Sequence, residues 1–329
     1  MKLRIFAFLM VLILVFSACS EKTPNKPADS TTTTENNGDN TPQARTDFRV
    51  LLSSDIHCTF LNKWYGLSNE DRMEHWVNSV LAEHERHPID LIIFPGDLSL
   101  DHWGGSGSFE RWKESTTKEF IEKYASRLPA DIPKLYLPGN HEAYNNEQWK
   151  EITGNDYYCS YVLGTNLFIG LDAFGDDSAT QGDYKPMNVE FIKSEMEKYP
   201  NTNVFLVAHY FDMNKESAEF KKLLGQSKRI VGLFQGHVHR STLHPQGTVY
   251  GNLTIAQTGH FAFSDDANPE KDFWGFRDIV ITEKGAVSSY IQVSSHADVS
   301  KIGKFTDIPR TVQNVQNYGF RFRPKQNEE

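Results

Sequence analysis

Cysteine is scarce in this chain. The 329 residues include three cysteines, Cys19, Cys58 and Cys159. A disulfide-rich scaffold is therefore excluded, because such scaffolds are short chains held by several bridges. Cys58 and Cys159 could pair in an oxidising compartment, and two free buried thiols are the equally good alternative.

Positive charge is also in short supply. The chain has 34 basic and 43 acidic residues, which give a formal net charge of −9 at pH 7. A nucleic-acid-binding surface needs a basic patch or stripe, and the sequence contains none. We therefore expect no nucleic-acid partner.

Long apolar runs are missing except at the amino terminus. Lys2 and Arg4 precede an unbroken apolar run from Ile5 to Phe16, which is followed by Ser17 and Ala18. This order predicts a secretory signal peptide over residues 1–18, because the run is too short to span a bilayer comfortably. A transmembrane anchor is the alternative interpretation.

The residue after this run is Cys19, an arrangement that resembles the bacterial lipobox. The resemblance implies that Cys19 is lipidated and becomes the first residue of the mature chain. Residues 19–46 are rich in Thr, Asn, Pro and Asp, which predicts a flexible tether. We therefore expect an exported lipoprotein anchored to a membrane, on the periplasmic side or at the cell surface.

The remainder of the chain, from about residue 47, is long enough for one large α/β domain or two modest ones. We expect one domain over residues 47–295, with a polar tail over 296–329 that packs on the domain or hangs loose. Short apolar runs alternate with amphipathic segments, as in a sheet with helices on its faces. We expect the strands after residue 251 to close a second sheet. The strand-containing segments are 48–57, 91–97, 134–142, 203–210 and 230–239, and the helical segments are 70–86, 108–128, 187–198 and 215–225.

Each of the five strand-containing segments contains or ends in residues that could bind a metal. Any one of them could be a helix cap, a turn or a structural histidine. Ligand sites in α/β sheets gather outside the carboxyl ends of strands, so five such clusters predict a single site. The candidate ligands are Asp55, His57, Asp97, Asn140, His209, His237 and His239.

The spacing of these residues suggests how they bind. Asp55 and His57 are two residues apart, so on a strand they would project from one face and hold one cation; His237 and His239 have the same spacing. Carboxylate and imidazole donors favour Mn, Fe, Zn or Co over Mg. Seven ligands are too many for one ion, which predicts two divalent ions sharing a bridging carboxylate.

The order of these motifs resembles that of the calcineurin-like metallophosphoesterases over residues 48–292. The matching stretches are Asp55-Ile56-His57, Gly96-Asp97, Gly139-Asn140-His141-Glu142, His209 and Gly236-His237-Val238-His239. The resemblance implies a two-sheet mixed β-sandwich flanked by helices.

The resemblance also implies a role for each ligand. Asp55, His57 and His239 would hold the first ion, Asn140, His209 and His237 the second, and Asp97 would bridge both together with a hydroxide. His141 would be the catalytic residue that donates a hydrogen bond to the phosphoryl group or a proton to the leaving oxygen.

The function implied by the resemblance is hydrolysis of a phosphomonoester or phosphodiester by metal-bound hydroxide, outside the cytoplasm, on a small phosphorylated substrate. A surface lipoprotein that binds phosphoesters without cleaving them is the alternative. Two neighbouring features stay open. Asp101 either orients His141 or is a solvated loop acid, and Trp103 either lines the substrate site or packs structurally.

Overall fold

The computed structural model describes residues 45, 47–61, 63–64, 66–102, 114–142, 144–174, 183–250, 253–262, 273–295, 310–320 and 322. The chain separates into two units, residues 1–43 and 44–329. The predicted signal peptide, Cys19 and the predicted tether as far as residue 44 lie outside the described residues. The loop that carries Trp103 lies outside them as well.

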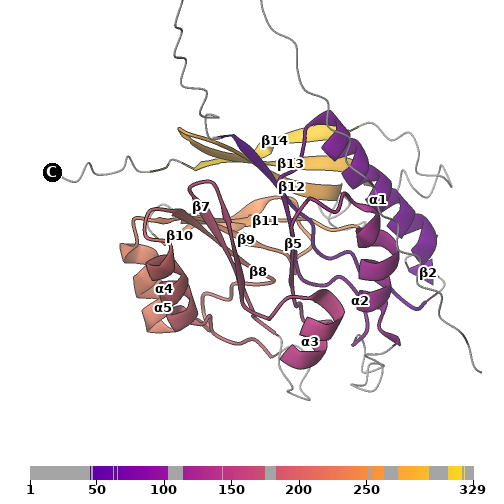
Figure 1. The fold of residues 1–329 in the computed structure, drawn as a ribbon, viewed down its shortest axis with the longest axis horizontal. Helices are drawn as coiled ribbons and strands as arrows, with labels where there is room; N and C mark the ends of the chain where they lie inside the picture. Colours follow the sequence, from indigo (N-terminus) through magenta and orange to yellow (C-terminus); the bar gives the residue numbers. More distant parts are fainter. Residues whose placement is uncertain are drawn as a thin grey trace, which may run out of the picture. The chain divides into compact units, whose positions relative to one another are not determined.

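Two six-stranded sheets form the body of the second unit (Figure 1). The first sheet has the order β14-β13-β12-β1-β4-β5, and the second has the order β10-β11-β9-β8-β7-β6. The first contains β1 (Phe48–Leu52), β4 (Leu91–Pro95), β5 (Lys134–Leu137), β12 (Phe273–Thr282), β13 (Gly285–Ser295) and β14 (Thr311–Phe320). The second contains β6 (Cys159–Leu163), β7 (Asn166–Leu171), β8 (Asn203–Ala208), β9 (Ile230–Gln235), β10 (Leu243–Tyr250) and β11 (Leu253–Gln257).

Both sheets are mixed. β1, β4 and β5 are parallel, whereas β12, β13 and β14 add antiparallel strands beside β1. In the second sheet β7, β8, β9 and β11 are parallel, and β6 and β10 are antiparallel edge strands. The parallel strands of each sheet therefore end at one common edge.

The helices cover the outer faces of the two sheets. α1 (Asn69–Arg86), α2 (Thr116–Glu119) and α3 (Asn146–Thr153) accompany the first sheet, and α2 continues into a π-helical segment (Phe120–Tyr124) and a 3₁₀ turn (Ala125–Arg127). α4 (Val189–Lys198) and α5 (Ala218–Gln226) pack on the second sheet (Figure 1). A two-stranded ribbon of β2 (Lys63–Trp64) and β3 (Leu67–Ser68) precedes α1.

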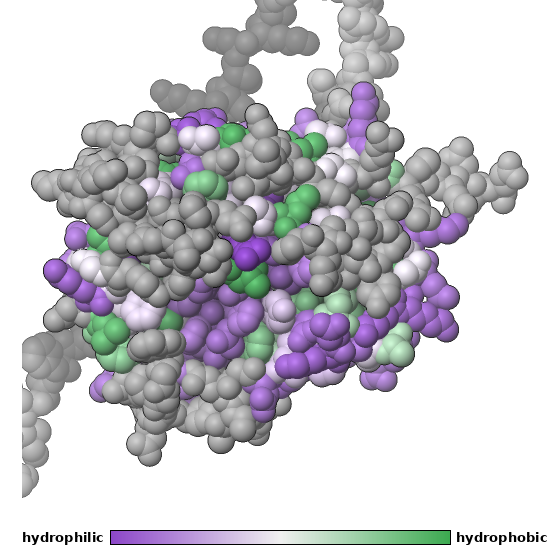
Figure 2. Space-filling view, turned by 180° about the vertical axis from the view of Figure 1, so that it is seen from behind, coloured by the Kyte–Doolittle hydropathy of each residue, from purple (hydrophilic) through white to green (hydrophobic). Residues whose placement is uncertain are grey.

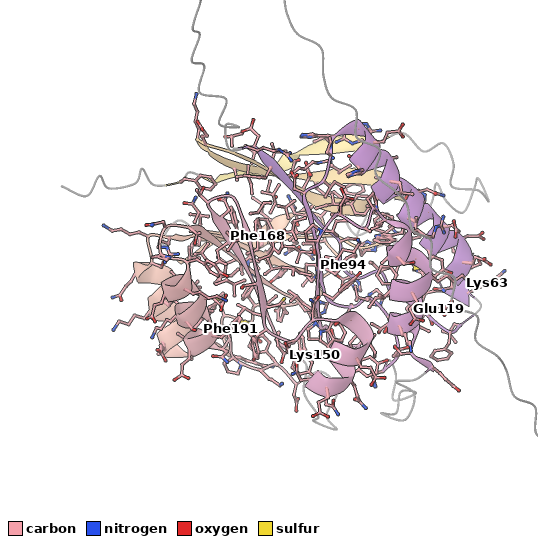
Figure 3. The ribbon with its side chains drawn as sticks, in the orientation of Figure 1. Lys63, Phe94, Glu119, Lys150, Phe168 and Phe191 are labelled. Carbon is pink, nitrogen blue, oxygen red and sulfur yellow. The ribbon has the colours of Figure 1, made fainter. Side chains whose placement is uncertain are left out.

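Side-chain alternation along the strands creates three apolar layers. In β1, Val50 and Leu52 enter the core between the sheets, whereas Leu51 packs on the helical side. The same alternation places Phe168 of β7 in the central layer with Ile93 of β4, whereas Phe94, the next residue of β4, packs beside α1 (Figure 3). The predicted two-sheet α/β sandwich flanked by helices is therefore confirmed.

Several expectations about individual elements need correction. β12 and β13 do not close the second sheet, because they pair next to β1 in the first. Residues 311–320, left open as part of the tail, form the edge strand β14. α3 was not expected, although Asn145 and Gln148 form a capping box that announces its first turn.

The surface of the described residues is mainly hydrophilic. On the face drawn in Figure 2, hydrophobic residues occur in small separate spots. Within the described ranges, the exposed large hydrophobic side chains are Phe60, Val287 and Val312. None of the described helices combines the length and apolarity needed to cross a membrane. Cys58 and Cys159 are free thiols.

Candidate metal centre

The predicted ligands lie in the loops that follow five parallel strands, β1, β4 and β5 of the first sheet and β8 and β9 of the second. β1 ends at Leu52 and β9 at Gln235, so neither histidine-containing pair lies on a strand. The expectation that residues two apart share one strand face is therefore wrong for both pairs. The loops themselves direct these side chains.

Left-handed backbone conformations provide this direction. Among the described residues, the non-glycine positions with positive φ are all candidate ligands, with φ between 51° and 68°. Such a conformation costs an L-residue roughly 1–2 kcal/mol. Strain of this kind persists only where the surroundings impose it, and it concentrates at functional sites. The residues concerned are Asp55, His57, Asp97, His237 and His239.

Two glycines let the loops approach closely. Gly96 has φ +88°, and a Cβ atom there would lie 2.7 Å from Nδ1 of His209. At Gly139 the constraint is space, since a Cβ atom would lie 2.1 Å from Oδ1 of Asp97. Both positions therefore need glycine for Asp97 and Asn140 to reach the centre.

The first group of candidate ligands consists of Asp55, His57, Asp97 and His239, each of which offers one atom within 4.8 Å of the others. Nε2 of His239 lies 3.2 Å from Oδ1 of Asp55 and 3.2 Å from Nε2 of His57. Asp55, His57 and Asp97 are almost completely buried. These side chains come from the β1, β4 and β9 loops, so both sheets contribute.

The second group consists of Asp97, His209 and His237. Nε2 of His209 lies 3.2 Å from Oδ2 of Asp97, and Nδ1 of His237 lies 3.2 Å from the same His209 nitrogen. Oδ1 of Asn140 joins them at 3.1 Å from His209 and 2.9 Å from His237. Asp97 belongs to both groups, whereas His237 and His239 belong to different ones.

The chemistry of the second group fits a bound cation. Nδ1 of His209 lies 2.7 Å from the carbonyl oxygen of Pro95 and must donate to it. In the neutral ring Nε2 then carries a lone pair. This lone pair faces oxygen atoms of Asn140 and Asp97. Lone pairs converging in this way repel one another unless a cation or a proton lies among them.

The electrostatics of the centre favour the same conclusion. Burial alone would raise the pKa of Asp97, but the imidazoles of His209, His141 and His57 hold it well below its usual range. Burial also acts to lower the pKa of His209, yet Asp97 raises it to about 9. Burial and the neighbouring His209 lower the pKa of His237 to about 4. Asp97 therefore favours positive charge at its side of the centre, and His237 favours the neutral form, whose ring nitrogens can bind a cation.

Glu142 organises the centre, a role that its place at the end of the Gly139-Asn140-His141-Glu142 motif did not reveal. Its carboxylate is completely buried and accepts hydrogen bonds from the backbone N–H groups of Asp97 (2.9 Å), Ser99 (2.8 Å) and Gly139 (2.8 Å). Burial and the nearby Asp97 raise the pKa of Glu142 to about 8, while these hydrogen bonds oppose the shift. Glu142 thereby joins the β4 and β5 loops.

Arg72 of α1 is a second organising residue that sequence reasoning missed. Its guanidinium is completely buried and donates to the carbonyl oxygens of Ile56 (2.9 Å), His57 (2.7 Å) and Phe261 (3.3 Å). Burial lowers its pKa to about 10. A signal was present in the sequence, because Arg72 shares the apolar face of α1 with Trp76 and Val80.

His141 lies beside the shared carboxylate. Its Nε2 is 3.8 Å from Oδ2 of Asp97, and its ring packs edge-on against His57 with centroids 5.4 Å apart. Nδ1 is buried and has no hydrogen-bond partner among the described residues. The ring is 16% exposed, so it is close to the centre and partly open to solvent.

Asp101 follows neither of the two interpretations left open for it. It is 4% exposed and accepts hydrogen bonds from Ser115 Oγ (2.8 Å), the N–H groups of Thr116 (2.9 Å) and Thr117 (3.2 Å), and the hydroxyl of Tyr144. Asp101 therefore anchors the start of α2, and these hydrogen bonds to its carboxylate all come from the start of α2 and from Tyr144.

Comparisons with known proteins agree with this geometry. The profile of the calcineurin-like phosphoesterase family matches residues 48–241, which include every candidate ligand. A search of curated proteins found no significant match.

Two solved structures share the fold. A dimetal phosphatase from Danio rerio superposes with a TM-score of 0.57 at 10% identity and covers 85% of this chain and 100% of its own. PhoD superposes with a TM-score of 0.55 at 11% identity and covers 84% of this chain and 70% of its own. At these identities the likeness concerns the fold alone. Together with the family profile it leads to one conclusion: the chain belongs to the calcineurin-like phosphoesterases, a family of metal-dependent enzymes.

Proposed function

We propose that this protein hydrolyses phosphoester bonds of small substrates with two divalent transition-metal ions held by the two ligand groups. The observation that carries the proposal is that Asp97 belongs to both groups, with Asn140 completing the second. Asp55, His57 and His239 would hold one ion, and Asn140, His209 and His237 the other. Mn, Fe, Zn and Co all suit these donors.

The protein's own contribution is to place the metal ligands and His141 around one position, where the phosphoryl group would bind. When bound, the two ions would supply positive charge for the phosphoryl oxygens and lower the pKa of a water molecule. Asp97 would fix the spacing of the two ligand groups, because it belongs to both. His141 would donate a proton to the departing oxygen, since its Nε2 lies 3.8 Å from Oδ2 of the shared ligand Asp97.

The first experiment tests metal content and turnover together. Purified protein should contain close to two transition-metal equivalents per chain, and a panel of phosphomonoesters and phosphodiesters should be hydrolysed with Mn, Fe, Zn or Co. A chelator should abolish activity until metal is restored. A metal-free protein that still cleaves esters would refute the dinuclear proposal, and metal-loaded protein that binds phosphoesters without turnover would establish the binding-protein alternative.

The second experiment tests His141. General acid catalysis typically contributes about a hundred- to ten-thousand-fold. His141→Ala should lose most of that factor on alkyl phosphates, whose leaving oxygens need a proton, and much less on p-nitrophenyl phosphate. Metal content should stay near that of the wild type. Equal losses on both substrates would assign His141 to phosphoryl positioning instead.

We also propose that the protein acts outside the cytoplasm on a membrane anchor. The support is the order of the leader, Cys19 and the polar segment 20–46 in the sequence. Cys19→Ser should give a protein that is exported and soluble, because segment 20–46 has no apolar stretch to retain it. Firm membrane attachment of this variant would contradict the lipobox interpretation.

A further inference from the structure

The position of His141 has to be fixed through its backbone. A histidine at a metal centre is usually oriented by a hydrogen bond from its second ring nitrogen. Nδ1 of His141 has no such partner among the described residues. Apart from the edge-on packing against His57, its orientation therefore depends on the peptide groups on either side of its Cα atom.

Both peptide groups are held by the β4 loop. The N–H of His141 donates to Oδ1 of Asp97 at 3.1 Å. Its carbonyl oxygen accepts two hydrogen bonds from one residue, His102, from the backbone N–H at 3.2 Å and from Nδ1 at 3.1 Å. A carbonyl oxygen only accepts, so Nδ1 of His102 must carry a proton.

His102 is itself held firmly. It is 5% exposed, and its ring packs edge-on against Tyr144 with centroids 4.9 Å apart. The hydroxyl of Tyr144 donates to Asp101, the carboxylate that anchors the start of α2. His102 is therefore connected to a helix terminus on one side and to His141 on the other.

We propose that His102 is a positioning residue that sets the orientation of His141 through the Nδ1–H hydrogen bond to the His141 carbonyl oxygen. This inference rests on the proposed function, in which His141 protonates the leaving oxygen. Asp97 and His102 stand five residues apart on one loop and grip opposite sides of His141. The loop thus couples the shared metal ligand to the acid.

Three substitutions test the donor. An asparagine side-chain amide places its nitrogen near the position of Nδ1, whereas a glutamine amide reaches the position of Nε2. His102→Leu and His102→Gln should lose about tenfold in kcat/KM on an alkyl phosphate, with a smaller loss on p-nitrophenyl phosphate and unchanged metal content. His102→Asn should recover most of the activity on the alkyl substrate.

A matched control removes a buried histidine elsewhere. His75 on α1 is 3% exposed and bonds Ser294 through Nε2 at 2.7 Å. His75→Leu should lower stability without changing the ratio of alkyl to aryl activity. If His102→Asn behaves like His102→Leu, or if the two substrates lose equally, the positioning role is disproved.

A measurement on the wild type separates this inference from the proposed function. Long-range ¹H–¹⁵N spectra of zinc-loaded protein report the tautomer of His102, assigned by the signals that His102→Asn removes. A proton on Nδ1 is expected, and a ring protonated only at Nε2 would refute the proposal even if the enzyme is active. Conversely, an Nδ1–H signal would support the hydrogen bond of His102 even if the protein cleaved no phosphoester. In that case the proposed function would be wrong.

Discussion

The two ends of β1 bury charged groups in opposite ways. At the amino end, Arg49 is 1% exposed and pairs with Glu83 at 2.9 Å and with Asp278 at 2.7 Å, and Arg310 adds a contact to Glu83 at 2.6 Å. Past the carboxyl end, carboxylate, amide and imidazole donors converge on one another, and five of these seven ligands have left-handed backbone.

The difference separates structural charge from functional charge. At the Arg49 end every charge has an opposite charge within the protein, so the network is complete as it stands. At the ligand end the carboxylates face imidazoles instead of permanently charged side chains, and the backbone is strained to bring these groups together. A buried group of this second kind indicates a missing partner, here a cation.

The largest expected effect comes from replacing one aspartate at each end of β1 and comparing metal content and activity. Asp97→Ala removes a ligand common to both groups and should empty both metal positions, with a loss of activity of at least about a thousandfold. Asp278→Ala should keep its metal and its activity while losing stability. Metal analysis and kcat/KM of the two variants decide between these outcomes, and an Asp97→Ala protein that retains two equivalents would contradict the assignment.

The next effect concerns stability at the Arg49 end. Arg49→Met removes the partner of Asp278 and leaves Glu83 with only the more exposed Arg86 and Arg310, so the free energy of unfolding should fall by about 3–5 kcal/mol. Urea unfolding measures it. The control is Arg45→Met, since the pair between exposed Arg45 and Asp90 should contribute at most about 1 kcal/mol. Equal effects of the two substitutions would show that burial is not the deciding factor.

Metal removal should destabilise the ligand end most. Restoring metal to chelated protein at about a hundred times its dissociation constant should add about 2.7 kcal/mol per bound ion to the free energy of unfolding. Hydrogen exchange should slow most in the loops at 53–57, 96–98 and 236–239, where local opening releases the ligands, and least around Arg49. Uniform protection across both ends would mean that the metal stabilises the whole fold rather than this edge.

A smaller effect is expected at Glu142. Glu142→Gln replaces one accepting oxygen by an NH₂ group that faces backbone N–H donors. Metal affinity should fall by about tenfold to a hundredfold, as for other partners that orient ligands. Titration with Zn or Mn measures the change. Glu74→Gln, a change at a half-exposed acid on α1, is the control, and wild-type affinity in Glu142→Gln would exclude an organising role.

Much of the fold followed from local pattern. Apolar runs such as Leu91–Pro95 and Asn203–Ala208 were visible because strands buried on both faces are continuously apolar. The sheet that β12 and β13 join was not visible, since pairing depends on which neighbours the whole chain brings close. The sequence did not predict β14, because the polar composition of this strand resembles that of a solvated tail.

The sequence by itself determined which residue types lie at the site. Aspartate, asparagine and histidine after five apolar runs specified the donors, and the order of the motifs specified the family, because both depend only on which residues follow one another. The tertiary structure alone decided how those donors meet. Positive φ at Asp55 and His239, the buried guanidinium of Arg72 and the grip of His102 on His141 all come from contacts between distant segments. Local propensity carries no record of such contacts, because their energy exists only once the two sheets have packed.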